Sequence, residues 1–232
     1  EATNELFEAA RETHRQNAVD IFMDCPARER AGWLCDSYFS SRVAFDFSGH
    51  TRIEKNFLEN FLLPKAFKHI DKGMLPMCYP SDHPNQNHIP NWAMWFVLEL
   101  EEYLHRSGDR ELVDRAKTRV YELVDYFKPF LNEDGLLEKL SRWVFVEWSA
   151  ANSLVQDVNY PSNMLYAKML EVIGRLYDDQ ALTQQAAQVR KAIVEQSYDG
   201  EFFVDNAVRG KGGKLEVTRN RTETCQYYAF YL

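Results

Sequence analysis

The sequence feature that most constrains the fold is a short glycine-containing phrase that recurs at a nearly constant interval. It reads Asp71-Lys-Gly-Met-Leu75, then Glu133-Asp-Gly-Leu-Leu137, then Tyr198-Asp-Gly-Glu-Phe202, so that its glycines stand 62 and 65 residues apart. A second set of short polar turns precedes these phrases, at 47–52, 106–110 and 176–180. Glycine and aspartate end helices in many proteins, but three matched pairs of turns indicate an internal repeat.

The segments between these turns show helical spacing. Residues 109–130 carry apolar side chains on one stripe, and residues 52–67 carry Ile53, Phe57 and Phe61 at intervals of four. Both patterns are typical of amphipathic helices. The same spacing predicts further helices over 4–20, 36–47, 91–107, 160–177 and 179–197, and one that begins near Thr222. The chain is therefore expected to hold about eight helices.

A repeat of two antiparallel helices predicts an all-α fold, because one such hairpin cannot bury both of its apolar faces alone. We expect an (α/α) toroid, a ring of six hairpins, of which about four are visible here. At roughly 60 residues each, six hairpins need on the order of 360 residues. The sequence thus predicts a single domain over residues 1–232, a partial ring truncated inside a helix at Tyr231-Leu232.

Charge and hydropathy argue against several classes of partner. Lysine and arginine total 27 against 35 aspartates and glutamates, a net charge of -8, which opposes attraction to nucleic acid or to an anionic membrane. The longest apolar run, Trp92 to Leu98, is far shorter than the roughly 18 residues of a membrane span, and no signal peptide opens the chain. We expect a soluble protein. Because an export signal ahead of Glu1 can have been removed, the sequence leaves open a bacterial cytoplasmic or an exported location.

The sequence indicates neither a cofactor nor a metal site. Gly210 to Gly213 lie in a polar turn rather than in a phosphate-cradling loop between strand and helix. His83 and His88 lie five residues apart in a proline-broken segment, which favours ordinary polar loop residues over metal ligands. The cysteines match no zinc or redox spacing, so we expect buried, reduced thiols at Cys25, Cys35, Cys78 and Cys225.

Chemically active side chains gather in four long links between the repeats, at 24–36, 79–92, 142–160 and 219–224. Each link precedes the same helix of its unit, so in a ring all four emerge at one end, where repeat folds carry their function. The links supply arginines, amides, the carboxylates Asp24, Glu29, Asp36, Glu147 and Glu223, and the tryptophans Trp33, Trp92, Trp143 and Trp148. Aromatic faces cover the apolar faces of sugars while carboxylates and amides bind hydroxyls, so carbohydrate is the expected ligand.

Hydrolysis of a glycosidic bond requires one protonated carboxyl group and one ionised carboxylate. In the first link, Asp24, Glu29 and Asp36 surround a turn, and crowding of acids raises the proton affinity of at least one of them. An alternative of equal weight is that Glu29 merely pairs with Arg28 and Arg30 on a solvated turn.

The acids of the later links are interpreted differently. Glu147 stands among bulky apolar residues, where a carboxylate is costly unless it is paired or protonated, which favours a functional role. Glu223 is narrowly favoured as an ordinary acid in the first turn of a helix. Trp95 and Phe96 are expected in the core, whereas Trp92 at its helix start can reach the pocket.

The segment Asp24-Cys-Pro-Ala-Arg-Glu-Arg-Ala-Gly-Trp33, followed by Asp36, resembles the signature of the α-L-rhamnosidases. These are glycoside hydrolases whose catalytic domain is a six-hairpin (α/α) toroid, and β domains can precede it. The resemblance implies that Glu29 is the general acid and that Asp24 and Asp36 contact the sugar. It also implies inversion of the anomeric configuration, so that a second carboxylate activates water.

Two departures from that family concern the same pocket. Cys35 stands where the family usually has glycine, and Glu147-Trp148 stands where it has an Asp-Trp pair. The family's base lies in a later loop, one or two hairpins beyond these residues. Within this chain, Glu147 is the first candidate for the base and Glu223 the second.

The leading hypothesis is an inverting bacterial glycoside hydrolase that cleaves terminal α-L-rhamnosyl residues, with Glu29 as proton donor and Glu147 as the second catalytic candidate. The expected sugar contacts come from Asp24, Arg28, Trp33, Asp36, Trp92, Trp148, Asp157 and Glu223. The alternatives are a non-catalytic carbohydrate-binding toroid and another six-hairpin glycosidase or lyase; the acid-rich links disfavour the lyase, whose substrate is a uronic acid. An incomplete ring leaves apolar faces open, so we expect self-association or a missing C-terminal part of the same polypeptide.

Overall fold

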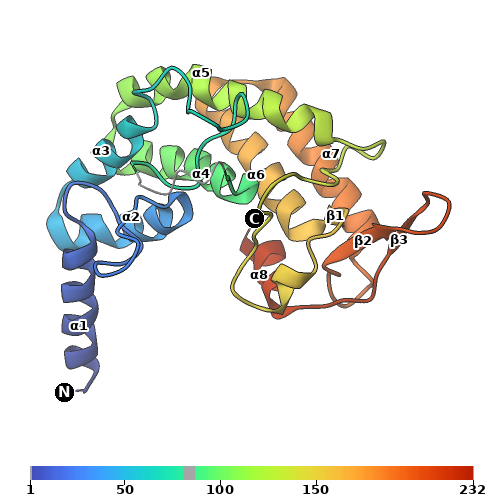
Figure 1. Ribbon diagram of the computed structural model, residues 1–232, viewed down its shortest axis with the longest axis horizontal. Coiled ribbons are helices and arrows are strands. Elements are labelled where there is room, and N and C mark those ends of the chain that lie inside the picture. Colours follow the sequence, from blue (N-terminus) through green and yellow to red (C-terminus); the bar gives the residue numbers. More distant parts are fainter. Residues whose placement is uncertain (1, 81–86, 232) are drawn as a thin grey trace.

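The computed structural model describes residues 2–80 and 87–231, and its helices follow an arc (Figure 1). The helices are α1 (Ala2–Asn17), α2 (Leu34–Ser48), α3 (Arg52–Asn60), α4 (Pro90–Ser107), α5 (Arg110–Phe127), α6 (Tyr160–Tyr177), α7 (Gln180–Ser197) and α8 (Glu223–Tyr231). Two 3-10 turns, at Lys128–Phe130 and Ala150–Ser153, and three short strands accompany them. The expected all-α architecture is confirmed.

The helices pair through tight turns at the places that the sequence repeat predicts. Gly49, Gly108 and Asp178 follow α2, α4 and α6, with φ angles of 69°, 69° and 54°. In each turn the N–H of this residue binds a carbonyl of the last helical turn. Left-handed backbone favours glycine and is tolerated by aspartate, so the third turn reaches the same conformation without a glycine.

Three helix pairs are complete among the described residues: α2 with α3, α4 with α5, and α6 with α7. The fourth hairpin of the sequence analysis is represented by α8 alone, and α1 precedes the first pair. Helix α1 projects from the arc and has no buried residue (Figure 1).

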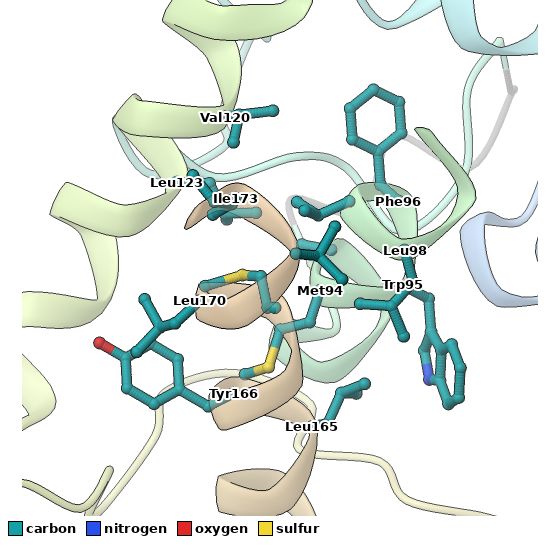
Figure 2. Packing of buried hydrophobic residues seen from close by; sticks show 14 of the residues in the cluster. Met94, Trp95, Phe96, Leu98, Val120, Leu123, Leu165, Tyr166, Leu170 and Ile173 are labelled. Atoms are coloured by element: carbon teal, nitrogen blue, oxygen red, sulfur yellow. The ribbon is translucent and has the colours of Figure 1, made fainter. Parts of the chain in front are cut away.

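The first helices of the pairs form an inner layer. Helix α4 packs between α2 and α6, and α6 also contacts α7 and α8. Side chains of α4, α5 and α6 meet in the core between the layers, among them Met94, Val120, Leu123, Leu170 and Ile173 (Figure 2). Trp95 and Phe96 are buried, as expected. Among the described helices, none is long and apolar enough to cross a bilayer.

Three helices end earlier than their apolar spacing predicted, and the first of them, α1, ends at Asn17 rather than near 20. Helix α3 stops at Asn60 rather than near 67, because Pro64 lacks an N–H and its ring clashes with a preceding helical turn. Phe61 continues the apolar spacing, but it fills the core from the turn that follows the helix. Helix α5 likewise ends at Phe127, and the segment to Phe130, which contains Pro129, is a 3-10 turn.

A small antiparallel sheet was not expected. Its strands β1 (Val158–Asn159), β2 (Asn206–Arg209) and β3 (Leu215–Val217) are arranged in that order. Val158 is opposite Ala207, and Ala207 is opposite Val217. The polar turn at 210–213 joins β2 to β3. The sheet therefore connects the segment before α6 to the segment before α8.

One partly buried arginine joins α2, α3 and α4. Arg106 of α4 donates hydrogen bonds to Glu54 of α3 at 2.5 Å, to Ser41 of α2 at 3.1 Å and to Glu102 of α4 at 2.8 Å. The Glu54 side chain is only 2% exposed. Its burial raises the pKa of Glu54 although Arg106 opposes the shift. This carboxylate therefore depends on Arg106 for its charge compensation.

Replacing Arg106 by methionine is expected to lower the free energy of unfolding by about 3 kcal/mol, because Glu54 stays buried without its counter-charge. The matched control is Arg115→Met. Arg115 of α5 forms a more exposed ion pair, at 2.7 Å, with Glu59, which belongs to the same helix α3 as Glu54. That change should cost less than about 1 kcal/mol. Urea denaturation measures both values, and equal losses would contradict the argument.

Glu99 of α4 is fully buried, and the Ser37 hydroxyl donates to its carboxyl oxygen at 2.6 Å. Burial raises the pKa of Glu99 well above its ordinary value. The folded protein thus keeps this proton to a higher pH than the unfolded chain does, so stability falls as pH rises above the ordinary pKa of glutamate.

Glu99→Gln removes this titrating group. The variant is expected to unfold at a higher temperature than the parent at mildly alkaline pH, and the advantage should shrink toward pH values near the ordinary pKa of glutamate. Thermal unfolding across that range measures the difference. An advantage that grows on acidification would refute the assignment.

Candidate functional site

The first link folds into a closed loop. The Asp24 N–H binds the Ala31 carbonyl at 3.2 Å, and the Ala31 N–H returns to the Asp24 carboxylate at 3.1 Å. At Gly32 a side chain would meet the Tyr79 carbonyl oxygen at 2.6 Å, so the loop lies directly against the second link. These contacts fix residues 24–31 in front of helix α2.

Glu29 lies on this loop with both carboxylate oxygens engaged. Arg28 Nε is 2.6 Å from Oε1, and the Cys25 thiol donates to Oε2 at 3.0 Å. These two donors, the Arg28 guanidinium first, lower the pKa of Glu29 to about 2. The pairing of Glu29 with Arg28 that the sequence left open is therefore present, and Glu29 is ionised in this state.

Asp36 lies in the first turn of α2 and binds a proton more readily than Glu29 does. Burial, together with the negative charges of Asp24 and Glu29, raises the pKa of Asp36 to about 6. Crowding of acids was expected to raise the proton affinity of at least one carboxyl. In the structure the pKa of Asp36 is raised, as expected for one of these acids, whereas the pKa of Glu29 is lowered.

A pocket of about 350 Å³ opens beside this loop. Its lining comes from the end of α1, the first link, the starts of α2 and α4, and the third link; among the lining residues are Asn17, Asp24, Asp36, Trp92, Glu147 and Trp148. Five residues chosen from the sequence therefore line one cavity. The fourth link contributes nothing to its lining, although Thr224 contacts Ser149 of the third link at 3.1 Å.

Aromatic rings run from the first link to the third. Trp33 packs edge-on against Trp92, whose ring packs against Phe145, with ring centroids 5.3 and 5.6 Å apart. Phe145 in turn contacts Trp143 and Trp148 at 5.5 and 4.8 Å. Trp148 is 77% exposed at the edge of the pocket. Trp33 and Trp143 support this row without lining the pocket.

The sequence analysis expected the Glu147 carboxylate to lie among bulky apolar side chains at a cost in free energy, and this expectation is wrong. Phe145 and Val146 are buried, but the side chain of Glu147 is exposed, so no burial cost applies to it. Its Oε1 accepts a hydrogen bond from the Trp148 N–H at 2.5 Å. Glu147 nevertheless lines the same pocket as Asp24 and Asp36.

Four of the expected sugar contacts lie outside the pocket lining, namely Arg28, Trp33, Asp157 and Glu223, and so does Glu29. Asp157 accepts a hydrogen bond from the Arg209 N–H of β2 at 2.7 Å and holds the small sheet against the third link. Glu223 is exposed in the first turn of α8, where it accepts from the Tyr227 hydroxyl at 2.7 Å. This matches the helix-start acid that the sequence favoured for Glu223.

The residues considered as metal ligands have other surroundings. His88 is buried rather than an ordinary loop residue, and its Nε2 is 3.0 Å from the Tyr126 hydroxyl; His83 lies outside the described residues. Within the described ranges, the one group close enough to share a metal ion is Asp24, Cys25 and Glu29.

Cys25 is the functional candidate that the sequence analysis missed. All four cysteines are free, as expected, but Cys25 and Cys35 are only partly buried. The spacing of four residues between Cys25 and Glu29 was a usable signal, because a loop closed by Asp24 and Ala31 brings these two side chains together.

Comparison with known proteins relates the chain to one family. The bacterial alpha-L-rhamnosidase 6 hairpin glycosidase domain matches residues 1–225. None of the curated proteins matches the chain.

Several solved structures are similar. A GH78 family rhamnosidase of Bacillus sp. GL1 is 21% identical over 89% of this chain and 22% of its own, with a TM-score of 0.76. A rhamnosidase from Klebsiella oxytoca with rhamnose bound is 18% identical over 94% of this chain and 43% of its own, with a TM-score of 0.66. An alpha-L-rhamnosidase from Dictyoglumus thermophilum is 15% identical over 83% of this chain and 23% of its own, with a TM-score of 0.59. The chain thus spans less than half of each of these proteins and shares their fold.

The Asp36 carboxyl is expected to titrate with a midpoint near 6. Asp24→Asn keeps the hydrogen-bond acceptor for the Ala31 N–H but removes one negative charge, so the midpoint of Asp36 should fall while staying above the ordinary value for aspartate, because burial remains. Carbon-13 NMR of labelled aspartate carboxyls measures both midpoints. A midpoint that Asp24→Asn leaves unchanged would rule out repulsion between the two acids.

Proposed function

The chain belongs to the bacterial alpha-L-rhamnosidase 6 hairpin glycosidase domain family, and we propose that it carries the proton-donor side of a glycoside hydrolase site. The substrate of this proposal is a terminal α-L-rhamnosyl residue, and the reaction inverts its anomeric configuration. The single observation that carries the proposal is the pocket in which Asp24, Asp36 and Glu147 meet Trp92 and Trp148.

This lining suits a neutral ligand rich in hydroxyl groups. Carboxylates accept hydrogen bonds from hydroxyls, and tryptophan faces cover the apolar face of a sugar ring. The choice of rhamnose is supported by the family and by the rhamnose bound to the Klebsiella oxytoca relative. A uronic acid is disfavoured, because Asp24, Asp36 and Glu147 would repel its carboxylate.

In the proposed reaction, protonated Glu29 gives its proton to the glycosidic oxygen as the bond from that oxygen to the anomeric carbon breaks. A water molecule attacks the anomeric carbon from the opposite face and loses its proton to a carboxylate base. The products are the free sugar, with inverted configuration, and the alcohol. Asp24 and Asp36 bind hydroxyls, and Trp92 and Trp148 form the walls.

Glu147 is the first candidate for the base within these residues. It lines the pocket from the third link, whereas Asp24 and Asp36 line it from the first link and the start of α2. Glu223 is the weaker second candidate, because it lies outside that lining and accepts the Tyr227 hydroxyl. In this proposal the 232 residues are one part of a toroid domain.

The decisive experiment compares the full-length polypeptide with its Glu29→Gln variant on aryl α-L-rhamnosides. A poor leaving group needs a proton, so the variant should lose at least about a hundredfold in kcat/KM on such substrates. Good leaving groups depart without a proton, so their turnover should change little. Proton NMR of the first sugar anomer formed tests inversion.

The matched control is Glu195→Gln, for which we expect less than about a threefold change, because this acid lies on the exposed face of α7, where it pairs with Lys191. Unchanged turnover of poor leaving groups by Glu29→Gln would remove Glu29 from the mechanism. Retention of configuration would overturn the inverting reaction.

A non-catalytic carbohydrate-binding toroid is the second candidate. It is favoured by the ion pair between Arg28 and Glu29, because a permanently ionised Glu29 can accept hydrogen bonds but cannot donate a proton. In this case rhamnose would raise the melting temperature of the full-length polypeptide, while no aryl glycoside would be cleaved.

A further inference from the structure

The two oxygens of the Glu29 carboxylate are held by donors of different kinds. Oε1 is 2.6 Å from Nε of Arg28, whose side chain is 83% exposed. Oε2 accepts the thiol proton of Cys25 at 3.0 Å, and Glu29 itself is 22% exposed. One partner is thus an exposed surface cation, and the other is a short neutral side chain on the closed loop.

These two hydrogen-bond donors differ in whether they can stay in place when the Glu29 carboxyl group is protonated. A protonated carboxyl group has one O–H and one oxygen that still accepts, so a neutral thiol can remain on Oε2. Arginine is always charged and only donates, so its guanidinium cannot remain on an oxygen that carries a proton. Oε1 can therefore be protonated only after Arg28 has moved away.

We propose that Cys25 is a positioning residue for Glu29: its thiol holds Oε2, so that Oε1 becomes the oxygen that delivers the proton once Arg28 leaves it. This inference rests on the proposed role of Glu29 as the general acid. Cys25 touches neither the sugar nor the reacting atoms. It acts by fixing the rotation of the carboxyl group, which directs the O–H bond.

The surroundings of Glu29 make Cys25 well placed for this role. The loop that carries both residues is closed on itself by the Asp24 to Ala31 hydrogen bonds, so the thiol keeps its position when Arg28 moves. The charged groups that act on Glu29 are Arg28, Asp24 on the same loop and Asp36 on α2. A hydrogen bond with the Asp24 side chain also lowers the pKa of Glu29, but by less than those from Arg28 and Cys25, so the thiol on Oε2 is the stronger neutral donor.

The test uses Cys25→Ala and Cys25→Ser in the full-length polypeptide, with aryl α-L-rhamnosides of poor and good leaving groups. Cys25→Ala should lower kcat on the poor leaving group by about tenfold, because misdirected proton donation loses part of its effect. KM and the turnover of the good leaving group should change less than about twofold. Cys25→Ser supplies a hydroxyl donor and should restore most of the lost rate.

The pH profile gives a second readout that a purely structural role would not move. The thiol lowers the pKa of Glu29 by donating to its ionised form. Its removal should therefore shift the alkaline limb of kcat/KM to higher pH, because a general acid is active below its pKa.

The matched control is Cys225→Ala, which removes a buried thiol of α8 whose partner is the Val204 carbonyl. This change should lower the melting temperature without altering the ratio of the rates for poor and good leaving groups. If Cys25→Ala does not fold, Cys25→Val keeps a side chain of similar volume without the donor and carries the same expectation.

The outcomes separate the two proposals. In one outcome, Glu29→Gln abolishes turnover of the poor leaving group, while the Cys25 variants keep the parent's ratio of rates for poor and good leaving groups and the parent's alkaline limb of kcat/KM. The role of Cys25 is then refuted, and Glu29 remains the acid. If Glu29→Gln leaves that turnover intact, the proposed function fails, and the role of Cys25 fails with it.

Discussion

The packing of α4 between α2 and α6 is the constraint on which the rest of the molecule depends. Most of α4 and α6 is buried, and their first turns are joined by a buried hydrogen bond from Asn91 to Ser162 at 2.8 Å. Each of the first three links ends where one of these inner helices begins, so the docked helices determine where those links lie. Asp36 and Trp92 therefore line one pocket although they are 56 positions apart in the sequence.

Much of the arrangement of helices was predictable because it is encoded locally. Gly49 and Gly108 permit the left-handed backbone of a tight turn, and the apolar stripe of α5 identifies a helix with one buried face. The small sheet was not predictable in this way, because its strands are two to four residues long and β1 pairs with a strand nearly 50 residues further along the chain. The end of α3 followed from Pro64, a local signal that the spacing of Phe57 and Phe61 concealed.

The composition of the site was predictable from the sequence, but the state of each side chain was not. Asp24, Asp36, Trp92, Glu147 and Trp148 do meet, because they belong to links on the same side of the inner helices. Whether an acid is buried or paired depends on neighbours that spacing does not reveal, as the exposed Glu147 illustrates. The same limit explains why Arg28 could be named from the sequence only as one alternative partner of Glu29, and why the Cys25 thiol was recognised only in the folded loop.

The contacts of Arg106 also specify the register of the arc. Arg106 belongs to α4, and its guanidinium hydrogen-bonds Glu54 on α3 and Ser41 on α2. One side chain thus fixes the relative positions of three helices. A shift of α4 by one helical turn would displace the guanidinium by about 5 Å. The Glu54 carboxylate would then remain buried without its positively charged partner. Apolar surfaces tolerate sliding far better than a buried charge does. The apolar core therefore holds the hairpins together, while this polar contact selects a single alignment between them.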